Sequence, residues 1–281
     1  MSNASFEPDP FEVSDGARVI RGESQGEGPD IFLAHGLSAT RTYVVHGSKV
    51  LPRAGYRLHT WDARGHGESD PAPAYDYEGL EDDLDMIAGA RGSAGPLIVG
   101  GHSMGCHTAV AWALAEPARV AALVLVGPVY TGQEPDCDLE RWDERADALE
   151  NGGPKEFARV IGERLTAPPD VQETIVRLAE RRAALHRHPE AVAEALRQVP
   201  RSRPFGSLAE LESIGAPVLI VASHDEADDG HPYAVAEAYR DVMPGAEMIS
   251  EEKGESPLSW QGGRLSRAIA AFLAKHGVDG Q

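Results

Sequence analysis

The 281-residue sequence has few cysteines and no long apolar run, and both shortages restrict the class of protein it describes. Its two cysteines, Cys106 and Cys137, are too few for a disulfide framework, which favours the reducing cytoplasm. No uncharged apolar run approaches the roughly 20 residues that span a bilayer. Residues 1–10 lack the basic and apolar regions of a signal peptide. We therefore expect a cytoplasmic protein without a membrane partner.

Basic side chains are also scarce. The chain has 26 Lys and Arg residues against 45 Asp and Glu residues, which gives a formal net charge of −19. A negative field of this size repels phosphate backbones, so nucleic acid is a poor candidate partner. We interpret the acidity as a source of solubility, and the sequence leaves the oligomeric state open.

Short apolar runs alternate with helical patterns along most of the chain, which is typical of βαβ units and a mostly parallel sheet. Residues 31–33, 97–99 and 218–221 are continuously apolar, as expected for central strands covered by helices on both faces. The predicted strands are 17–22, 30–35, 56–61, 96–101, 120–127, 217–222 and 246–250. Helices are predicted at 77–90 and 103–115, and the last helix is expected to begin near Pro257.

One long segment interrupts this alternation, because every pattern within it is helical. Its apolar stripes lie at 139–149, 157–165, 171–178 and 185–199. Asp170 is the predicted N-cap of the helix that carries the third stripe. Helices inserted between two core strands predict a cap over the carboxyl ends of the sheet, where open α/β sheets bind ligands. We therefore predict a core domain of residues 1–130 and 204–281, with a helical cap or lid at 131–203.

A G-x-S-x-G motif joins the predicted strand at 96–101 to the helix that follows. It reads Gly101-His102-Ser103-Met104-Gly105. The two glycines remove side chains that would clash in a sharp turn from strand to helix. Such a turn lifts the serine hydroxyl above the sheet, at the positive end of the helix dipole. Ser103 is therefore the predicted nucleophile.

Two further motifs lie at the ends of earlier strands. Residues 35–37 read His-Gly-Leu, and residues 64–69 read Arg-Gly-His-Gly-Glu-Ser. The His-Gly pair precedes a loop whose backbone N–H groups can face the nucleophile. We predict that the amides near Leu37 and Met104 form an oxyanion hole.

In the order and spacing of these motifs the chain resembles the α/β-hydrolase superfamily. It looks most like the small esterases, lactonases, C–C bond hydrolases and proline iminopeptidases that carry a helical cap. The resemblance covers about residues 13–273 and implies an α/β-hydrolase fold. It also implies structural roles for His66 and His102, a small-molecule carbonyl substrate, and hydrolysis that needs no cofactor and no metal. The serine at position 103 argues against the haloalkane dehalogenase and epoxide hydrolase branches of the superfamily, whose members have aspartate at the nucleophile position.

The resemblance places a catalytic acid after the strand at 217–222. The loop that follows offers four acidic residues. Counting forward from the strand favours Asp225 or Glu226, whereas counting back from the next helix favours Asp228. We adopt Asp228 as the predicted acid.

The resemblance also places a catalytic histidine in a G-H-x-P-like turn after the last strand, and here the sequence departs from the family. The turn at 254–257 reads Gly-Glu-Ser-Pro, so Glu255 occupies the histidine position. A carboxylate of pKa ~4 is a weak base for a serine hydroxyl unless burial raises its pKa. Loss of the histidine from a serine protease triad costs about 10⁶-fold in kcat.

Three hypotheses address this substitution. In the first, His231 replaces the missing base, ahead of His224, His186 and His188, and Glu255 supplies the orienting carboxylate. In the second, a buried Glu255 with a raised pKa drives a decarboxylation, isomerisation or cyclisation. In the third, the chain retains the pocket but only binds a ligand. Our preferred expectation is hydrolysis of a small ester, lactone or related carbonyl compound through the serine.

Overall fold

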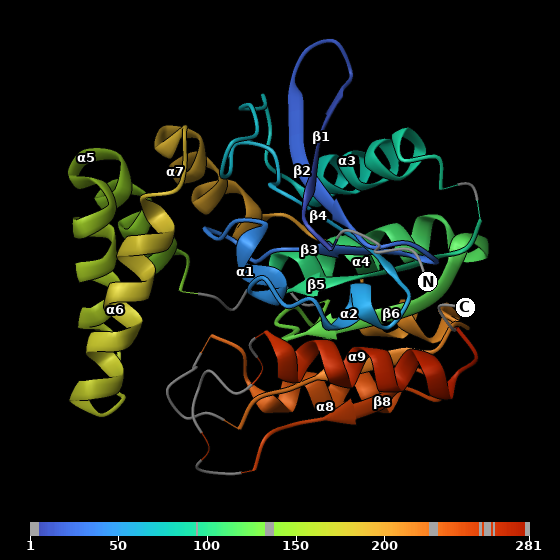
Figure 1. Ribbon diagram of the computed structural model, residues 1–281. Helices are drawn as coiled ribbons and strands as arrows, with labels where there is room; N and C mark the ends of the chain where they lie inside the picture. Colours follow the sequence, from blue (N-terminus) through green and yellow to red (C-terminus); the bar gives the residue numbers. More distant parts are fainter. Residues whose placement is uncertain are drawn as a thin grey trace.

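The computed structural model describes residues 6–93, 95–132, 138–224, 230–252, 255, 260 and 262–278, and Figure 1 shows a sheet flanked by helices. The strands are β1 (Asp9–Ser14), β2 (Val19–Gln25), β3 (Asp30–Ala34), β4 (Arg57–Trp61), β5 (Leu97–His102), β6 (Val120–Val126), β7 (Val218–Val221) and β8 (Glu247–Ile249). The α-helices are α1 (Thr42–Val45), α2 (Val50–Arg53), α3 (Tyr77–Ala90), α4 (Met104–Ala115), α5 (Leu139–Glu163), α6 (Pro169–Ala183), α7 (Pro189–Gln198), α8 (Tyr233–Val242) and α9 (Gly263–Lys275). Short 3₁₀ helices are η1 (Pro117–Arg119), η2 (Val199–Arg201) and η3 (Leu208–Ser213).

The sheet has the strand order β1-β2-β4-β3-β5-β6-β7-β8. β2 pairs antiparallel with β1 and β4, and all the other pairs are parallel. The mostly parallel sheet confirms the predicted fold class, and each of the seven predicted strands overlaps an observed one. β1 was not predicted. Only two of its residues, Phe11 and Val13, are buried, and two apolar positions are too few for a clear alternation of apolar and polar residues.

Helices cover both faces of the sheet, as the continuous apolar strands predict. On one face, side chains of α3, α4 and α8 pack against Phe32, Val99 and Leu123. On the other face, α1, α2 and α9 pack against Ile31 and Val124. Within the described ranges, none of these helices combines the length and apolarity that crossing a bilayer requires.

The predicted start of the last helix at Pro257 lies outside the described residues. The helix itself, α9, runs from Gly263 to Lys275. Its buried side chains include the predicted apolar stripe, namely Leu265, Ile269, Phe272 and Leu273. The helical spacing thus identified the side of α9 that packs on the sheet.

The segment between β6 and β7 contains α5, α6, α7 and η2, and we call residues 139–201 the helical insertion. Figure 1 shows α5 and α6 set apart from the sheet, with α7 between them and the core. Ala191 and Ala195 of α7 pack against the core residues Tyr75 and Tyr77. No strand occurs in the helical insertion, all of which is described, in agreement with the helical patterns of its sequence.

The first two stripes, at 139–149 and 157–165, lie on the two sides of a kink in α5, where Gly153 has non-helical backbone angles and Pro154 follows. One local prediction for the helical insertion needs correction. The prediction that Asp170 is an N-cap is wrong. Pro168 holds that position and α6 begins at Pro169, so Asp170 lies in the first turn. Proline suits the first helical position because its ring fixes φ and the missing N–H needs no partner there.

Candidate active site

The turn from β5 into α4 has the geometry of a nucleophile elbow. Ser103 has φ 53° and ψ −112°, a conformation that residues with a side chain rarely adopt. Its N–H donates to the carbonyl oxygen of Val126 on the neighbouring strand at 2.9 Å. A Cβ atom on Gly101 or Gly105 would lie 2.4 or 2.3 Å from the carbonyl oxygen of Ala34. The turn is therefore pressed against β3, and both glycines are sterically required.

The loop of residues 36–40 follows β3. It begins with a turn in which the N–H of Ala39 donates to the carbonyl oxygen of Gly36 at 3.0 Å. Ser38 has φ 60°, in the left-handed region. Leu37 packs against the apolar cluster that contains Met104, the first residue of α4. The two segments predicted to supply oxyanion amides are therefore neighbours.

Three buried histidines, His35, His66 and His186, form hydrogen bonds and ring contacts around this loop. His35 Nδ1 donates to the carbonyl oxygen of Gly36 at 2.8 Å, and its Nε2 accepts from the N–H of Ala63 at 2.9 Å. The rings of His35 and His66 are 5.2 Å apart between centroids, and those of His66 and His186 are 5.6 Å apart. The contacts of His66 agree with the structural role that the resemblance implies, because both of its ring nitrogens bond backbone groups.

These histidines are held neutral. Burial is the main cause, and it lowers the pKa of His35 to about 4, of His66 to about 3 and of His186 to about 4. Repulsion between neighbouring rings lowers these pKa values further. His186, one of the candidate replacement bases, has both ring nitrogens bonded to backbone groups. It is therefore occupied as a structural group.

His231 lies close to the elbow. Its ring centroid is 4.8 Å from that of His102, the residue before Ser103. An ideal Cβ on Gly127, just after β6, would lie 3.0 Å from His231 Cδ2. His102 in turn packs against Gly36, where a Cβ would lie 2.8 Å from His102 Nδ1. The preferred candidate base is thus next to the strand ends that carry the nucleophile.

Another histidine, His107 on α4, holds the chain after β6. Its Nε2 accepts from the N–H groups of Val129 and Tyr130 at 3.1 and 3.2 Å. Burial lowers its pKa to about 3, and the charge of a protonated His231 would lower it further. His107 is therefore a structural group that fixes the segment leading into the helical insertion.

Glu251, just after β8, is a buried carboxylate that sequence reasoning missed. It is 2% exposed and accepts from Ser223 Oγ at 2.7 Å, the His224 N–H at 2.5 Å and Trp260 Nε1 at 2.8 Å. Burial alone would raise the pKa of Glu251, but these hydrogen bonds outweigh it and hold the pKa below the ordinary value of 4.5. Glu251 thereby joins the segments after β7 and β8. The available signal was its position two residues after Ile249 at the end of a predicted strand, and the adjacent Glu252 obscured it.

The expectation of a buried Glu255 with a raised pKa is wrong. Glu255 is exposed, and its carboxylate lies 3.0 Å from Arg264 Nη1. The hydrogen bond and the charge of Arg264 lower the pKa of Glu255 below 4.5. The other predicted acids, Asp225, Glu226 and Asp228, lie outside the described residues.

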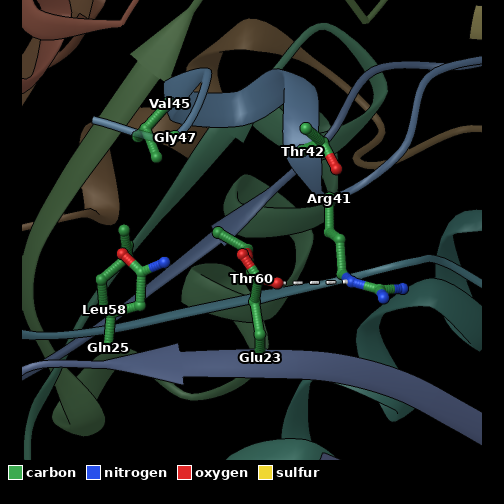
Figure 2. Close-up of a pocket in the computed structure, with 8 residues that line it drawn as sticks. All are labelled: Glu23, Gln25, Arg41, Thr42, Val45, Gly47, Leu58 and Thr60. Carbon is green, nitrogen blue, oxygen red and sulfur yellow. Dashed lines mark ion pairs between the residues drawn. The ribbon is translucent and has the colours of Figure 1, made fainter. Parts of the chain in front are cut away.

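A small cavity lies between β2, β4 and residues 41–47. Figure 2 shows it, with a volume of about 40 Å³ and the ion pair between Arg41 and Glu23, whose N–O distance is 3.8 Å. Its lining residues are Glu23, Gln25, Arg41, Thr42, Val45, Gly47, Leu58 and Thr60. Pockets for small organic ligands are typically about 300–1,000 Å³, so this cavity is too small for an ester substrate. Arg41 also pairs with Asp62.

Among the residues that the structure describes, no group of three or more histidine, cysteine and acidic side chains has the arrangement of a metal site.

The strand order, the glycine-flanked elbow and the loop after β3 are the marks of one fold family. A family model for the alpha/beta hydrolase fold matches residues 29–216. The chain belongs to the α/β-hydrolase family. The match begins at β3 and includes the elbow and the helical insertion.

Relatives in this family are hydrolases by name. A 2-hydroxy-6-oxononadienedioate/2-hydroxy-6-oxononatrienedioate hydrolase of Pseudomonas putida is 30% identical over 70% of this chain and 71% of that protein. A putative carbamate hydrolase, RutD, of Variovorax paradoxus is 28% identical over 74% of this chain and 77% of its own length. A mouse sn-1-specific diacylglycerol lipase is 34% identical over 50% of this chain, and the chain spans only 43% of that relative.

Solved structures share the fold over almost the whole chain. A thermophilic esterase from Thermogutta terrifontis has a TM-score of 0.74 at 24% identity, covering 96% of this chain and 99% of the esterase. An enol-lactonase from Burkholderia xenovorans has a TM-score of 0.73 at 20% identity, covering 96% of this chain and 100% of the lactonase. These likenesses establish the fold of the chain.

The contacts of Glu251 lead to a stability prediction. Glu251→Gln is expected to lower the free energy of unfolding at pH 7 by about 2 kcal/mol, because the amide N–H₂ would face the N–H of either His224 or the Trp260 indole, and both can only donate. Since folding lowers the pKa of Glu251, its stabilisation is present above pH 4.5 and is lost as the pH falls through the folded-state value. The difference between wild type and variant, measured by urea unfolding, is therefore expected to shrink below pH 4.5.

Glu252→Gln is the matched control, because Glu252 is the adjacent residue and is exposed. It should leave the urea midpoint unchanged. Equal losses in the two variants would mean that the buried contacts of Glu251 do not stabilise the fold.

Proposed function

We propose that the protein is a serine hydrolase that cleaves a small ester, lactone or related carbonyl compound. The observation that carries this proposal is the strained elbow at Ser103, with φ 53° at the amino end of α4. Strain at a single residue in a packed turn is typical of a functional position. The helix dipole at this end favours negative charge, which suits an attacking serine oxygen.

In the proposed reaction the Ser103 oxygen attacks the substrate carbonyl carbon and gives its proton to His231. The carbonyl oxygen becomes an oxyanion that accepts hydrogen bonds from the N–H groups of Leu37 and Met104. The tetrahedral intermediate collapses to an acyl-enzyme as the protonated imidazole gives its proton to the leaving oxygen. Water then attacks the acyl carbon, with His231 taking its proton. As the bond from the acyl carbon to the Ser103 oxygen breaks, His231 returns this proton to that oxygen and the carboxylic acid product leaves.

The position of His231 supports its assignment as the base. Its ring touches the region of His102 and Gly127, at the carboxyl ends of β5 and β6. A triad is defined by geometry and not by chain order, so a base from the loop after β7 can serve an elbow after β5. We propose Asp228, on the same loop, as the acid that orients this imidazole.

The names of the relatives and structural neighbours support hydrolysis over the other hypotheses. They include an esterase, an enol-lactonase, a putative carbamate hydrolase and a hydrolase of a hydroxy-oxo-dienedioate, and the compounds in these names all contain a carbonyl group. A decarboxylase or isomerase would need Glu255 buried, and its carboxylate is exposed beside Arg264. Glu255 is therefore left out of the proposed chemistry.

We further propose that the helical insertion caps the site, that the substrate is a small molecule and that the enzyme works in the cytoplasm. A reducing compartment suits the buried free thiol of Cys106, whose pKa is raised by burial. A protein with net charge −19 is a poor partner for nucleic acid.

Ser103→Ala tests the nucleophile. Turnover of a short-chain p-nitrophenyl ester should fall by at least about 10³-fold, because no other oxygen can form the acyl-enzyme. The exposed Ser213 on η3 provides the control, and Ser213→Ala should match the wild type. Equal turnover by wild type and Ser103→Ala would show that the elbow does not hydrolyse esters.

His231→Ala tests the base. We expect kcat to fall by about 10²–10⁴-fold with a small change in KM, since proton transfer acts in the transition state and not in binding. His224 belongs to the same loop, and its ring stacks on Tyr233 with centroids 3.8 Å apart. His224→Ala should retain activity. A fully active His231→Ala variant would place the base elsewhere.

A further inference from the structure

We propose that His186, in the link between α6 and α7 of the helical insertion, is a positioning residue that holds the 36–40 loop in the shape an oxyanion hole needs. This inference rests on the proposed function, because it concerns the same site. Its basis is the way in which Ser38, next to the proposed donor Leu37, is held on both sides by histidines.

The peptide groups of Ser38 bond to two rings from different parts of the fold. The Ser38 N–H donates to His66 Nε2 at 3.4 Å, and the Ser38 carbonyl oxygen accepts from His186 Nε2 at 3.1 Å. With φ 60°, Ser38 has a conformation that costs free energy and persists only when its surroundings fix it. His186 supplies part of that fixation from 148 residues away in the chain.

The other side of the His186 ring is anchored as well. His186 Nδ1 accepts from the Gly67 N–H at 2.9 Å, and the Gly67 carbonyl oxygen accepts from the Arg187 N–H at 2.8 Å. Because Nδ1 accepts and Nε2 donates, the ring is neutral with its proton on Nε2. The turn after β4 thus locks the orientation of the ring that bonds Ser38.

The side chain of Leu37 gives a second, independent link between the loop and the helical insertion. Leu37 packs against the cluster formed by Met104, Tyr77 and residues of α7. It also packs against the cluster inside the insertion that contains Leu149 and Leu196. Backbone and side chain of the loop are therefore both held by the insertion. A displacement of about 1 Å at a reacting group can cost on the order of 10²-fold in rate.

Two amide substitutions separate the bonds of His186. In Gln the amide N–H₂ reaches the position of Nε2, so His186→Gln keeps a donor for Ser38 and loses the acceptor for Gly67. In Asn the amide oxygen takes the position of Nδ1, so His186→Asn keeps the acceptor and loses the donor to Ser38. His188→Asn is the matched control from the same link, because the His188 side chain is 30% exposed and lies 3.3 Å from Glu190.

We expect His186→Asn to lower kcat by about 30-fold with KM within about twofold, and His186→Gln to stay within about threefold of wild type. Amide hydrogen exchange, read by mass spectrometry on peptides covering residues 36–40, should be faster in the Asn variant only. The substrate is the same short-chain p-nitrophenyl ester, and turnover by Ser103→Ala is subtracted as background.

Equal kcat losses in the Asn and Gln variants, or unchanged kcat and exchange in both, would overturn the proposal. If the wild type shows no turnover that depends on Ser103, the proposed function fails. The exchange measurement then tests the role of His186 in the loop independently of activity. Faster amide exchange at residues 36–40 in His186→Asn alone supports this role, and identical exchange in all variants refutes it. A fall in melting temperature equal for Asn and Gln, with exchange raised throughout both, would also refute it.

Discussion

The site depends on how closely the turn from β5 into α4 packs against β3. Side chains at positions 101 and 105 would collide with the Ala34 carbonyl group, so the chain can leave the strand this tightly only with glycine at both. The same turn forces Ser103 to a positive φ. The fold thus places a half-buried serine at the amino end of a helix, where developing negative charge is stabilised.

Around this turn, neutral buried histidines act as connectors between segments that are distant in the chain. An imidazole with a low pKa offers one donor and one acceptor at a fixed separation, so it can join two backbone groups without burying a charge. His35 joins the ends of β3 and β4, and His107 fixes the segment after β6. Glu251 performs a similar task for the segments after β7 and β8. The proposed catalytic groups are therefore carried by loops that are tied to one another.

The sequence predicted the central sheet well, because its signals are local. Val218–Val221 is continuously apolar and is a fully buried strand, and the motif around Ser103 has fixed spacing. Non-local contacts could not be predicted in this way. His186 and Gly67 are 119 residues apart, and no sequence pattern pairs them. For Glu255 the sequence suggested a buried site residue, but it did not show that the carboxylate is exposed and paired with Arg264.

The central claim is that the elbow serine is an activated nucleophile, and covalent labelling tests it most directly. Wild-type protein would be treated with a p-nitrophenyl alkylphosphonate and examined by intact-mass spectrometry and peptide mapping. The account predicts one adduct per chain, on the peptide that contains Ser103, because the phosphonyl group mimics the tetrahedral intermediate. No adduct at all, or an adduct on another residue, would contradict it.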